Sequence, residues 1–111
     1  MLEKRVKNLT KLLSDFVSEL QKDVRVDRVY LYGSYARNSE HDFSDIDVAV
    51  ISPDFEGGTE HDYLILGKAA LKVNPLIEAK PYRPEDLHNL SPAEFLSEVL
   101  RTGRIVYDKA A

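Results

Sequence analysis

The sequence contains no cysteine among its 111 residues. Disulfide bonds, thiolate nucleophiles and cysteine-ligated zinc are therefore excluded. It also lacks an excess of basic residues, because 15 lysines and arginines stand against 19 aspartates and glutamates, which gives a net charge of −4. Nucleic-acid affinity rests largely on the neutralisation of phosphates by lysine and arginine. This balance argues against free DNA or RNA as the main partner.

Long apolar runs are also missing. No segment approaches the roughly 20 apolar residues of a membrane-spanning helix, and the N-terminus lacks the apolar core of a secretory signal. We therefore expect a cytoplasmic protein with no membrane partner. The length of 111 residues fits one domain, residues 1–111, with one modest core. No room is left for a separate substrate-binding domain, so an acceptor would have to dock from outside.

The most informative stretch begins with Val29 to Tyr32, whose β-branched, aliphatic and aromatic side chains predict a strand. Gly33 ends that strand, and residues 34–37 are expected to begin a helix. Gly33 allows close backbone approach, the Ser34 hydroxyl can bind a phosphate oxygen, and the free amides of a first helical turn attract anions. This order of elements predicts an anion site.

A second strand is predicted within residues 44–51, which read Ser-Asp-Ile-Asp-Val-Ala-Val-Ile. The period of two in a strand puts Asp45 and Asp47 on one face and the apolar residues between them on the other. Two carboxylates so close repel each other unless a cation lies between them, and oxygen ligands suit Mg²⁺ or Mn²⁺ rather than zinc. A phosphate cradle followed by this pair indicates metal-assisted phosphoryl or nucleotidyl transfer.

Together, residues 33–37 (Gly-Ser-Tyr-Ala-Arg) and 44–50 (Ser-Asp-Ile-Asp-Val-Ala-Val) resemble the signature of the DNA polymerase β-like nucleotidyltransferase superfamily in its minimal form. The resemblance spans most of the chain. It implies an α/β (α+β) fold, with a small mixed β-sheet and helices packed mainly on one face, as in the palm of polymerase β. It also implies Mg²⁺-dependent transfer of a nucleoside monophosphate, AMP from ATP, to an acceptor hydroxyl.

The resemblance also implies roles for individual residues. Gly33 and Ser34 would bind the nucleoside triphosphate, while Asp45 and Asp47 would be catalytic metal ligands. Arg37 follows the glycine by four positions, and its guanidinium can reach a triphosphate or pair with a carboxylate. We keep Arg37 as a nucleotide-binding candidate with both roles open.

A third strand is predicted over residues 76–80, and Glu78 stands in it between apolar neighbours. Burial of an unpaired carboxylate in a strand costs free energy of folding, so a glutamate at position 78 indicates either a functional role or exposure to solvent. One interpretation makes it the third catalytic carboxylate, which ligates metal or draws the proton from the acceptor; the family usually has aspartate at this place. The other makes it an edge-strand residue that is exposed to solvent or paired with Lys80 or Arg83.

Two further features lie around the motif. His41 invites a role as metal ligand or general base, but a solvated loop histidine is the better interpretation, because only the assigned aspartates accompany it at metal-ligand spacing. After the second strand, Pro53, Gly57 and Gly58 predict a loop near the active site. That loop would either fold over a bound nucleotide or act as a mobile connector.

The remaining segments predict a scaffold. Residues 2–22 have the apolar periodicity of an amphipathic helix, whose buried face covers its own sheet or, alternatively, contacts a partner or a second copy in a homo-oligomer. The other elements predicted are a helix over Thr59–Val73 with Thr59 as N-cap and Asp62 at the third position, a short helical piece at 84–87, a helix that starts with Ser91 as N-cap and Glu94 in a capping box and ends at Gly103, and a last strand over 104–108.

Minimal members of the family commonly occur beside an all-helical HEPN ribonuclease toxin, and the resemblance implies that this chain is the antitoxin that adds AMP to a toxin tyrosine. The rival hypothesis is an antitoxin that has lost catalysis and neutralises its partner by occupancy. Asn38, where the family usually has glycine, and Glu78 support the rival. Retention of both Asp45 and Asp47 favours activity.

Overall fold

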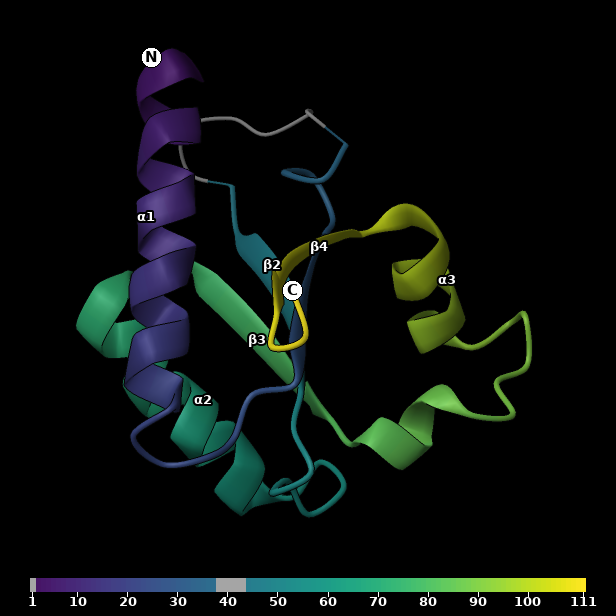
Figure 1. Cartoon of the computed structure of the whole chain (residues 1–111). Coiled ribbons are helices and arrows are strands. Elements are labelled where there is room, and N and C mark those ends of the chain that lie inside the picture. Colours follow the sequence, from purple (N-terminus) through teal and green to yellow (C-terminus); the bar gives the residue numbers. More distant parts are fainter. Residues whose placement is uncertain (1, 38–43) are drawn as a thin grey trace.

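The computed structural model describes residues 2–37 and 44–111. Asn38 and His41 lie outside these ranges. The described elements follow the order α1 (Leu2–Leu20), β1 (Arg28–Tyr32), β2 (Ile46–Ile51), α2 (Glu60–Val73), β3 (Ile77–Tyr82), the 3-10 turn η1 (Pro84–Leu87), α3 (Phe95–Thr102) and β4 (Arg104–Asp108) (Figure 1). Each helix and strand expected from residue 44 onward is present, with bounds that differ by a few residues.

The strands form one mixed sheet in the order β3-β2-β1-β4. β1 pairs antiparallel with β2 and with β4, whereas β2 pairs parallel with β3. A parallel pair needs a crossover, and α2 supplies it between β2 and β3. The predicted α/β fold with a small mixed sheet is therefore confirmed.

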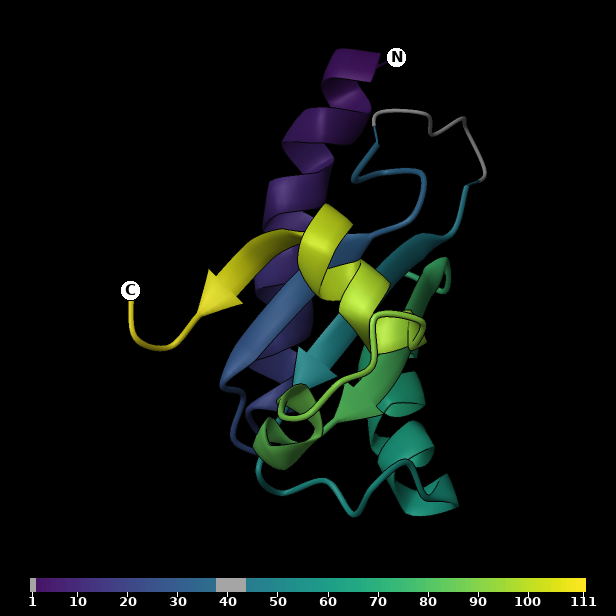
Figure 2. The ribbon, with the colours of Figure 1, turned by 90° about the vertical axis from the view of Figure 1, so that its right-hand side faces the viewer.

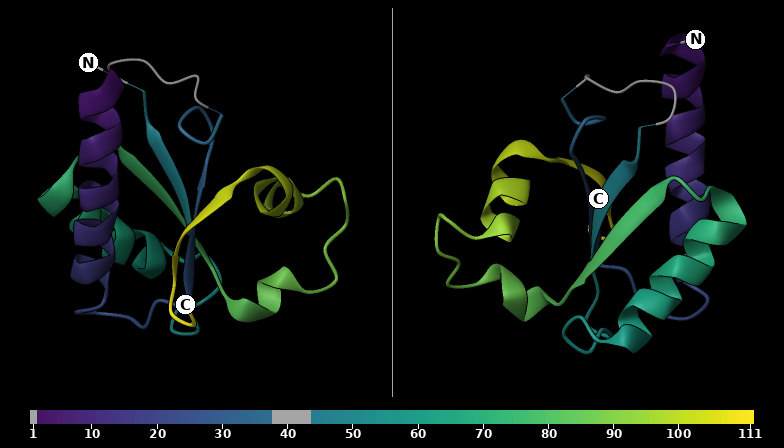
Figure 3. Two further views of the ribbon diagram at one scale, coloured as in Figure 1. Left: turned by 45° about the horizontal axis from the view of Figure 1, so that its top comes forward. Right: turned by 180° about the vertical axis from the view of Figure 1, so that it is seen from behind.

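Alternation along the strands divides the core into two layers. Leu31, Val48 and Val50 are buried with α1 residues such as Phe16 and Leu20 on one side of the sheet. Tyr30, Ala49 and Ile51 are buried with Leu96 and Val99 of α3 on the other side. Figure 3 shows α1 and α2 on one face of the sheet and α3 with η1 on the other, and Figure 2 shows α3 in front of the strands. The two longer helices thus share a face, as expected, and the shorter α3 covers part of the second face.

The amphipathic α1 covers the sheet of its own chain with Leu13, Phe16, Val17 and Leu20, all of which are buried. This confirms the intramolecular interpretation for that half of the helix. None of the helices that the structure describes is long and apolar enough to cross a lipid bilayer.

The start of α2 is the capping box that the sequence predicts. Thr59 accepts a hydrogen bond from the Asp62 amide, and the Asp62 carboxylate accepts one from the Thr59 amide. The fully buried Asp62 also accepts hydrogen bonds from the backbone amides of Glu56 and Gly58 at 2.8–2.9 Å. One carboxylate therefore holds the end of the preceding loop against the helix.

The start of α3 differs from the prediction. The helix begins at Phe95, and the Ser91 hydroxyl accepts the Ala93 amide at 3.2 Å instead of capping a helix. The Glu94 carboxylate accepts the Ser91 amide at 2.7 Å, so half of the expected capping box forms around a turn. Serine can close such a local turn at the expense of a helical start, which delays the helix.

Gly103 ends α3 as expected, but not in a left-handed conformation, since its φ is −79°. A Cβ atom here would lie 2.6 Å from the Val99 carbonyl oxygen and 3.0 Å from that of Leu31. Glycine is therefore required because backbone carbonyls, that of Val99 in α3 first and that of Leu31 in β1 second, occupy the space of a side chain.

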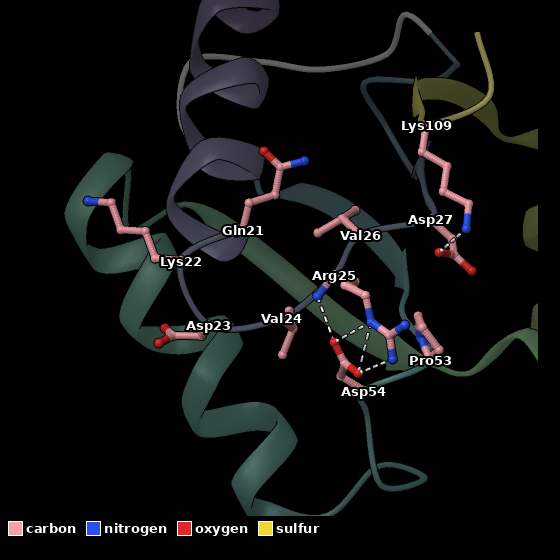
Figure 4. A pocket seen from close by; sticks show the side chains of 10 residues that line it. All are labelled: Gln21, Lys22, Asp23, Val24, Arg25, Val26, Asp27, Pro53, Asp54 and Lys109. Carbon is pink, nitrogen blue, oxygen red and sulfur yellow. Dashed lines mark hydrogen bonds and ion pairs between the residues drawn. The ribbon is translucent and has the colours of Figure 1, made fainter.

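The loop after β2 is not next to the predicted site, which corrects that expectation. β2 carries Asp47 near its start, and residues 52–58 leave from its other end, about 13 Å further along the strand. There, Arg25 donates to Asp54 from both its backbone amide and its guanidinium, at 2.7–3.2 Å. Figure 4 shows this ion pair in a hollow of about 540 Å³ that lies between the segment after α1 and Pro53.

An Asp54→Asn variant should lower the melting temperature at neutral pH. Hydrogen bonds from Arg25 and its charge lower the pKa of Asp54 to about 2. Because this pKa is below that of the unfolded chain, about 3.9, the stabilisation is present above pH ~4 and is lost as the pH falls toward 2. Thermal unfolding followed by circular dichroism from pH 7 to pH 2 should show a difference between wild type and variant that shrinks below pH ~4.

The matched control is Asp15→Asn, which removes the carboxylate of an exposed pair with Lys11 within α1. Exposed pairs of this kind contribute little, so the control should track the wild type at every pH. A difference for Asp54→Asn that persists undiminished to pH 2 would contradict the assigned ion pair.

Candidate active site

Strand pairing brings the predicted site residues together on three adjacent strands. Tyr32, at the end of β1, is opposite Asp47 of β2, and Asp47 is opposite Glu78 of β3. Gly33 follows Tyr32 directly. Asp47 therefore lies in the middle of a row, with the glycine turn on its β1 side and a second carboxylate on its β3 side.

The glycine turn is built to leave room for Asp47. Gly33 has a φ of +75°, and a Cβ atom at this position would collide with Oδ2 of Asp47. Tyr35 anchors the turn because its side chain is buried in the core shared with α1 and α2. The turn therefore presents backbone, not side chain, to the carboxylate.

The helix expected after Gly33 is present only as a single turn within the described residues. Residues 33–37 form turns, with one hydrogen bond from the Arg37 amide to the Gly33 carbonyl oxygen at 3.2 Å. The anion site that the sequence predicts at Gly33 and Ser34 would therefore rest on a turn with glycine backbone, and not on the dipole of a helix that has formed by residue 37.

Charges gather around Asp47. Burial raises the pKa of Asp47, the negative charges of Glu78 and Asp45 raise it further, and the positive charges of Lys80 and Arg37 oppose them. Arg37 is exposed at the end of the turn, and Glu78 is exposed on the edge strand β3. Glu78 thus combines the features of both interpretations, since it belongs to an edge strand and also lies beside Asp47.

The donor set suits a hard divalent cation. Asp45, Asp47 and Glu78 supply only oxygen ligands, and the negative charges of Glu78 and Asp45 add to burial in raising the pKa of Asp47. Among residues 2–37 and 44–111, no three acidic or histidine side chains are already grouped closely enough to hold an ion. A site for Mg²⁺ or Mn²⁺ at Asp45, Asp47 and Glu78 therefore stays a prediction from the sequence.

Sequence reasoning missed an aromatic wall beside the carboxylates. The rings of Tyr32 and Phe95 meet edge to face with centroids 5.4 Å apart, and the Lys80 ammonium lies 5.8 Å from the Phe95 centroid. Burial and the charges of Asp47, Tyr82, Glu78 and Tyr63 raise the pKa of Tyr32. The period of two along β3 puts Lys80 and Tyr82 on the same face as Glu78, so the sequence could have predicted these two residues near the site. No local signal pointed to Phe95, which comes from α3.

A Gly33→Ala variant should be destabilised and should bind ATP poorly. The positive φ alone costs about 1–2 kcal/mol for a residue with a side chain, and the new methyl group would also displace the Asp47 carboxylate. We expect a lower free energy of unfolding in urea and a loss of ATP binding measured by calorimetry.

Gly58→Ala is the matched control, because Gly58 has a φ of +88° but no atom within 4 Å of the added Cβ. It should show the backbone cost alone and retain ATP binding. Unchanged ATP affinity in Gly33→Ala would refute the role of this turn.

Comparison with known proteins shows the family of this chain. Residues 15–111 match the family model described as “Polymerase beta, Nucleotidyltransferase”. A protein of Methanocaldococcus jannaschii named “putative protein adenylyltransferase” is 31% identical over 104 residues, which cover 90% of this chain and 99% of the relative.

Solved structures share the fold. A crystal structure of a “putative nucleotidyltransferase from Sulfolobus solfataricus” superposes with a TM-score of 0.71 at 16% identity, covering 98% of this chain and 87% of the other. A toxin-antitoxin structure with AMP-PNP gives a TM-score of 0.55 at 22% identity, over 93% of this chain and 73% of that one. A variant of the toxin-antitoxin pair MntA-HpeT gives 0.52 at 20% identity, over 93% and 72%. The chain belongs to the polymerase beta nucleotidyltransferase family.

Proposed function

We propose that this chain transfers AMP from ATP to a tyrosine hydroxyl of a partner protein, a helical HEPN-type toxin, and thereby acts as the antitoxin of a toxin-antitoxin module. Two comparisons support the proposal. The relative at 31% identity is named for protein adenylyltransfer, and two structures of the same fold are toxin-antitoxin complexes, one of them with an ATP analogue.

The observation that carries the proposal is the row formed by Gly33, Asp47 and Glu78 across β1, β2 and β3. A nucleotidyl transfer needs a place for phosphates, a negatively charged metal site and a group near the attacking hydroxyl. The row supplies these in order, with Gly33 and Ser34 for the phosphates, Asp45 and Asp47 in the middle, and Glu78 on the far side.

The chemistry balances with these residues. The acceptor oxygen forms a bond to the α-phosphorus, the bond from that phosphorus to the bridging oxygen of the β-phosphate breaks, and pyrophosphate leaves with the electron pair. The proton of the acceptor hydroxyl passes to the Glu78 carboxylate and then to water. Arg37 offsets negative charge around the phosphates. When bound by Asp45 and Asp47, Mg²⁺ would neutralise charge on the phosphate oxygens.

The test combines the purified chain with α-labelled ATP, Mg²⁺ and the helical toxin, followed by intact-mass analysis of both proteins. The proposal predicts the addition of one or more AMP groups to the toxin. Peptide mapping should place AMP on tyrosine.

A catalytically silent antitoxin is the second candidate, because Glu78 replaces the aspartate usual in the family. It predicts a stable complex with the toxin and no change in mass. That result would overturn the transferase proposal for this chain.

A further inference from the structure

Lys80 lies one step along the sheet from the carboxylates of the candidate active site. Strand pairing sets Lys80 of β3 opposite Ala49 of β2, two positions beyond the point where Glu78 is opposite Asp47. Side chains two positions apart in a strand project from the same face of the sheet. Lys80 therefore shares the face that carries Asp47 and Glu78.

The ring of Phe95 holds the Lys80 ammonium over this face. Nζ of Lys80 lies 5.8 Å from the centroid of the ring, at the distance of a cation–π contact. The same ring meets Tyr32 edge to face, and Tyr32 is opposite Asp47 in the sheet. The ammonium thus lies on the side of the strands that α3 covers, and it does not extend outward from the edge of β3.

The charge of Lys80 acts on the carboxylates without being used in an ion pair. Among residues 2–37 and 44–111, no carboxylate is in ion-pair contact with Lys80. Burial and the charges of Glu78 and Asp45 raise the pKa of Asp47, and the charge of Lys80 opposes them more than that of Arg37 does. A lysine whose only role is to protect an edge strand from further pairing does not need such a place.

A bound nucleotide would need a cation at this place. ATP adds negative charge to a site that already holds carboxylates. In the proposed function, the terminal phosphates lie at Gly33, on the β1 side, and Arg37 is the cation close to them. The α-phosphate then comes between Gly33 and Glu78, near Asp47, and Lys80 is the cation on its β3 side. A fixed ammonium beside this phosphate stabilises the charge on its oxygens as the acceptor attacks.

We infer that Lys80 is a further residue of the active site, whose ammonium contacts a non-bridging oxygen of the α-phosphate and stabilises charge there during transfer. The inference rests on the proposed function and adds a cation on the side from which the acceptor attacks. Lys80 keeps its proton throughout, so the proton balance of the reaction is unchanged.

The first test measures the contact without turnover. The full chain with Mg²⁺ and no toxin is treated with a trace of acetic anhydride, with and without saturating α,β-methylene-ATP, whose α–β link resists transfer. Peptide mass analysis gives the acetylation rate of each lysine. We expect the nucleotide to slow acetylation of Lys80 at least about fivefold, because contact with phosphate shields the amine.

Lys68 is the internal control for this test. It is exposed on α2, which covers the other face of the sheet, and its acetylation rate should not change. Equal acetylation of Lys80 with and without bound nucleotide would overturn the inference.

Variants give the second test. Lys80→Gln should lower kcat for AMP transfer at least about tenfold, with a smaller loss of ATP affinity, because the charge at the α-phosphate matters most in the transition state. Lys80→Glu should lower kcat further. Lys80→Arg keeps the charge and should stay within about threefold of the wild type. Lys68→Gln is the matched control and should leave kcat unchanged. Losses that do not follow the charge at position 80 would refute the role of Lys80.

Calorimetric titration with α,β-methylene-ATP keeps the inference separate from the proposed function. Nucleotide binding that protects Lys80, without AMP transfer to the toxin, would leave Lys80 in the nucleotide site and refute the transferase. AMP transfer with Lys80 unprotected and Lys80→Gln fully active would do the reverse.

Discussion

An Asp47→Asn variant is expected to lose AMP transfer by at least about a thousandfold while folding at least as well as the wild type. The amide keeps the size of the side chain, so it still fits against Gly33. The substitution removes the negative charge between Gly33 and Glu78, and both the binding of a cation and the stabilisation of the transition state need this charge. A loss of this size equals about 4 kcal/mol of transition-state stabilisation, an ordinary figure for a metal-ligating carboxylate.

The stability of the Asp47→Asn variant should equal or exceed that of the wild type. The pKa of Asp47 is raised by burial and by Glu78 and Asp45, so its ionised form is less stable in the folded chain than in the unfolded chain. Above that pKa the charge costs stability, and below it the protonated carboxyl does not. In metal-free buffer at pH 7, Asp47→Asn should therefore melt at the same temperature as the wild type or higher.

Labelled-AMP transfer and thermal unfolding measure the two effects separately. Asp54→Asn is the control, because Asp54 pairs with Arg25 beyond the far end of β2. It should keep transfer activity and lose stability, the opposite of Asp47→Asn. Wild-type transfer by Asp47→Asn would remove Asp47 from the mechanism, and a large fall in melting temperature would remove the repulsion argument.

Local patterns in the sequence were sufficient for much of this fold. The alternation of buried residues along β2, the capping box at Thr59 and Asp62, and the apolar stripe of α1 all depend on neighbours within a few positions. The parallel pairing of β2 with β3 was also within reach, because two strands joined by one helix are usually neighbours in a sheet. The register that sets Glu78 opposite Asp47 was not.

The structure differs from the sequence-based prediction where residues far apart in the chain determine the local conformation. The helix after Gly33 was expected from a glycine followed by residues that tolerate helix, but the described part of the chain there is a turn anchored by Tyr35 in the core. The loop at Gly57 was expected beside the carboxylates because it follows their strand, yet a strand of six residues carries it to the other end of the sheet.

The hollow of about 530 Å³ that Tyr63, Tyr82 and Phe95 help to line had no sequence signal for a similar reason. Tyr63, Tyr82 and Phe95 belong to three elements and lie 13 to 32 residues apart in the chain. They meet only because α2 crosses one face, β3 runs parallel to β2, and α3 packs on the other face. Sites of this kind follow from topology, and periodicity alone does not reveal them.

Glu78 gives the second large effect. If its carboxylate accepts the acceptor proton, Glu78→Gln should lower kcat about a hundredfold, because the amide is isosteric but cannot take a proton at neutral pH. Glu78→Asp shortens the side chain by one methylene and restores the residue usual in the family. We expect it to keep activity within about tenfold of the wild type, since the site is exposed and the carboxylate can shift. Single-turnover transfer of labelled AMP measures both.

Glu19→Gln is the control for this pair. Glu19 forms ion pairs with Lys22 and Lys72, so it belongs to the side of the sheet covered by α1 and α2, and its loss should leave transfer unchanged. Equal rates for wild type and Glu78→Gln would make Glu78 a solvent-exposed edge residue with no part in the reaction. A large loss of activity in Glu78→Gln, with activity kept in Glu78→Asp, would show that the reaction needs a carboxylate beside Asp47. Glutamate can then replace the aspartate usual in the family, because the edge strand β3 leaves space for the longer side chain.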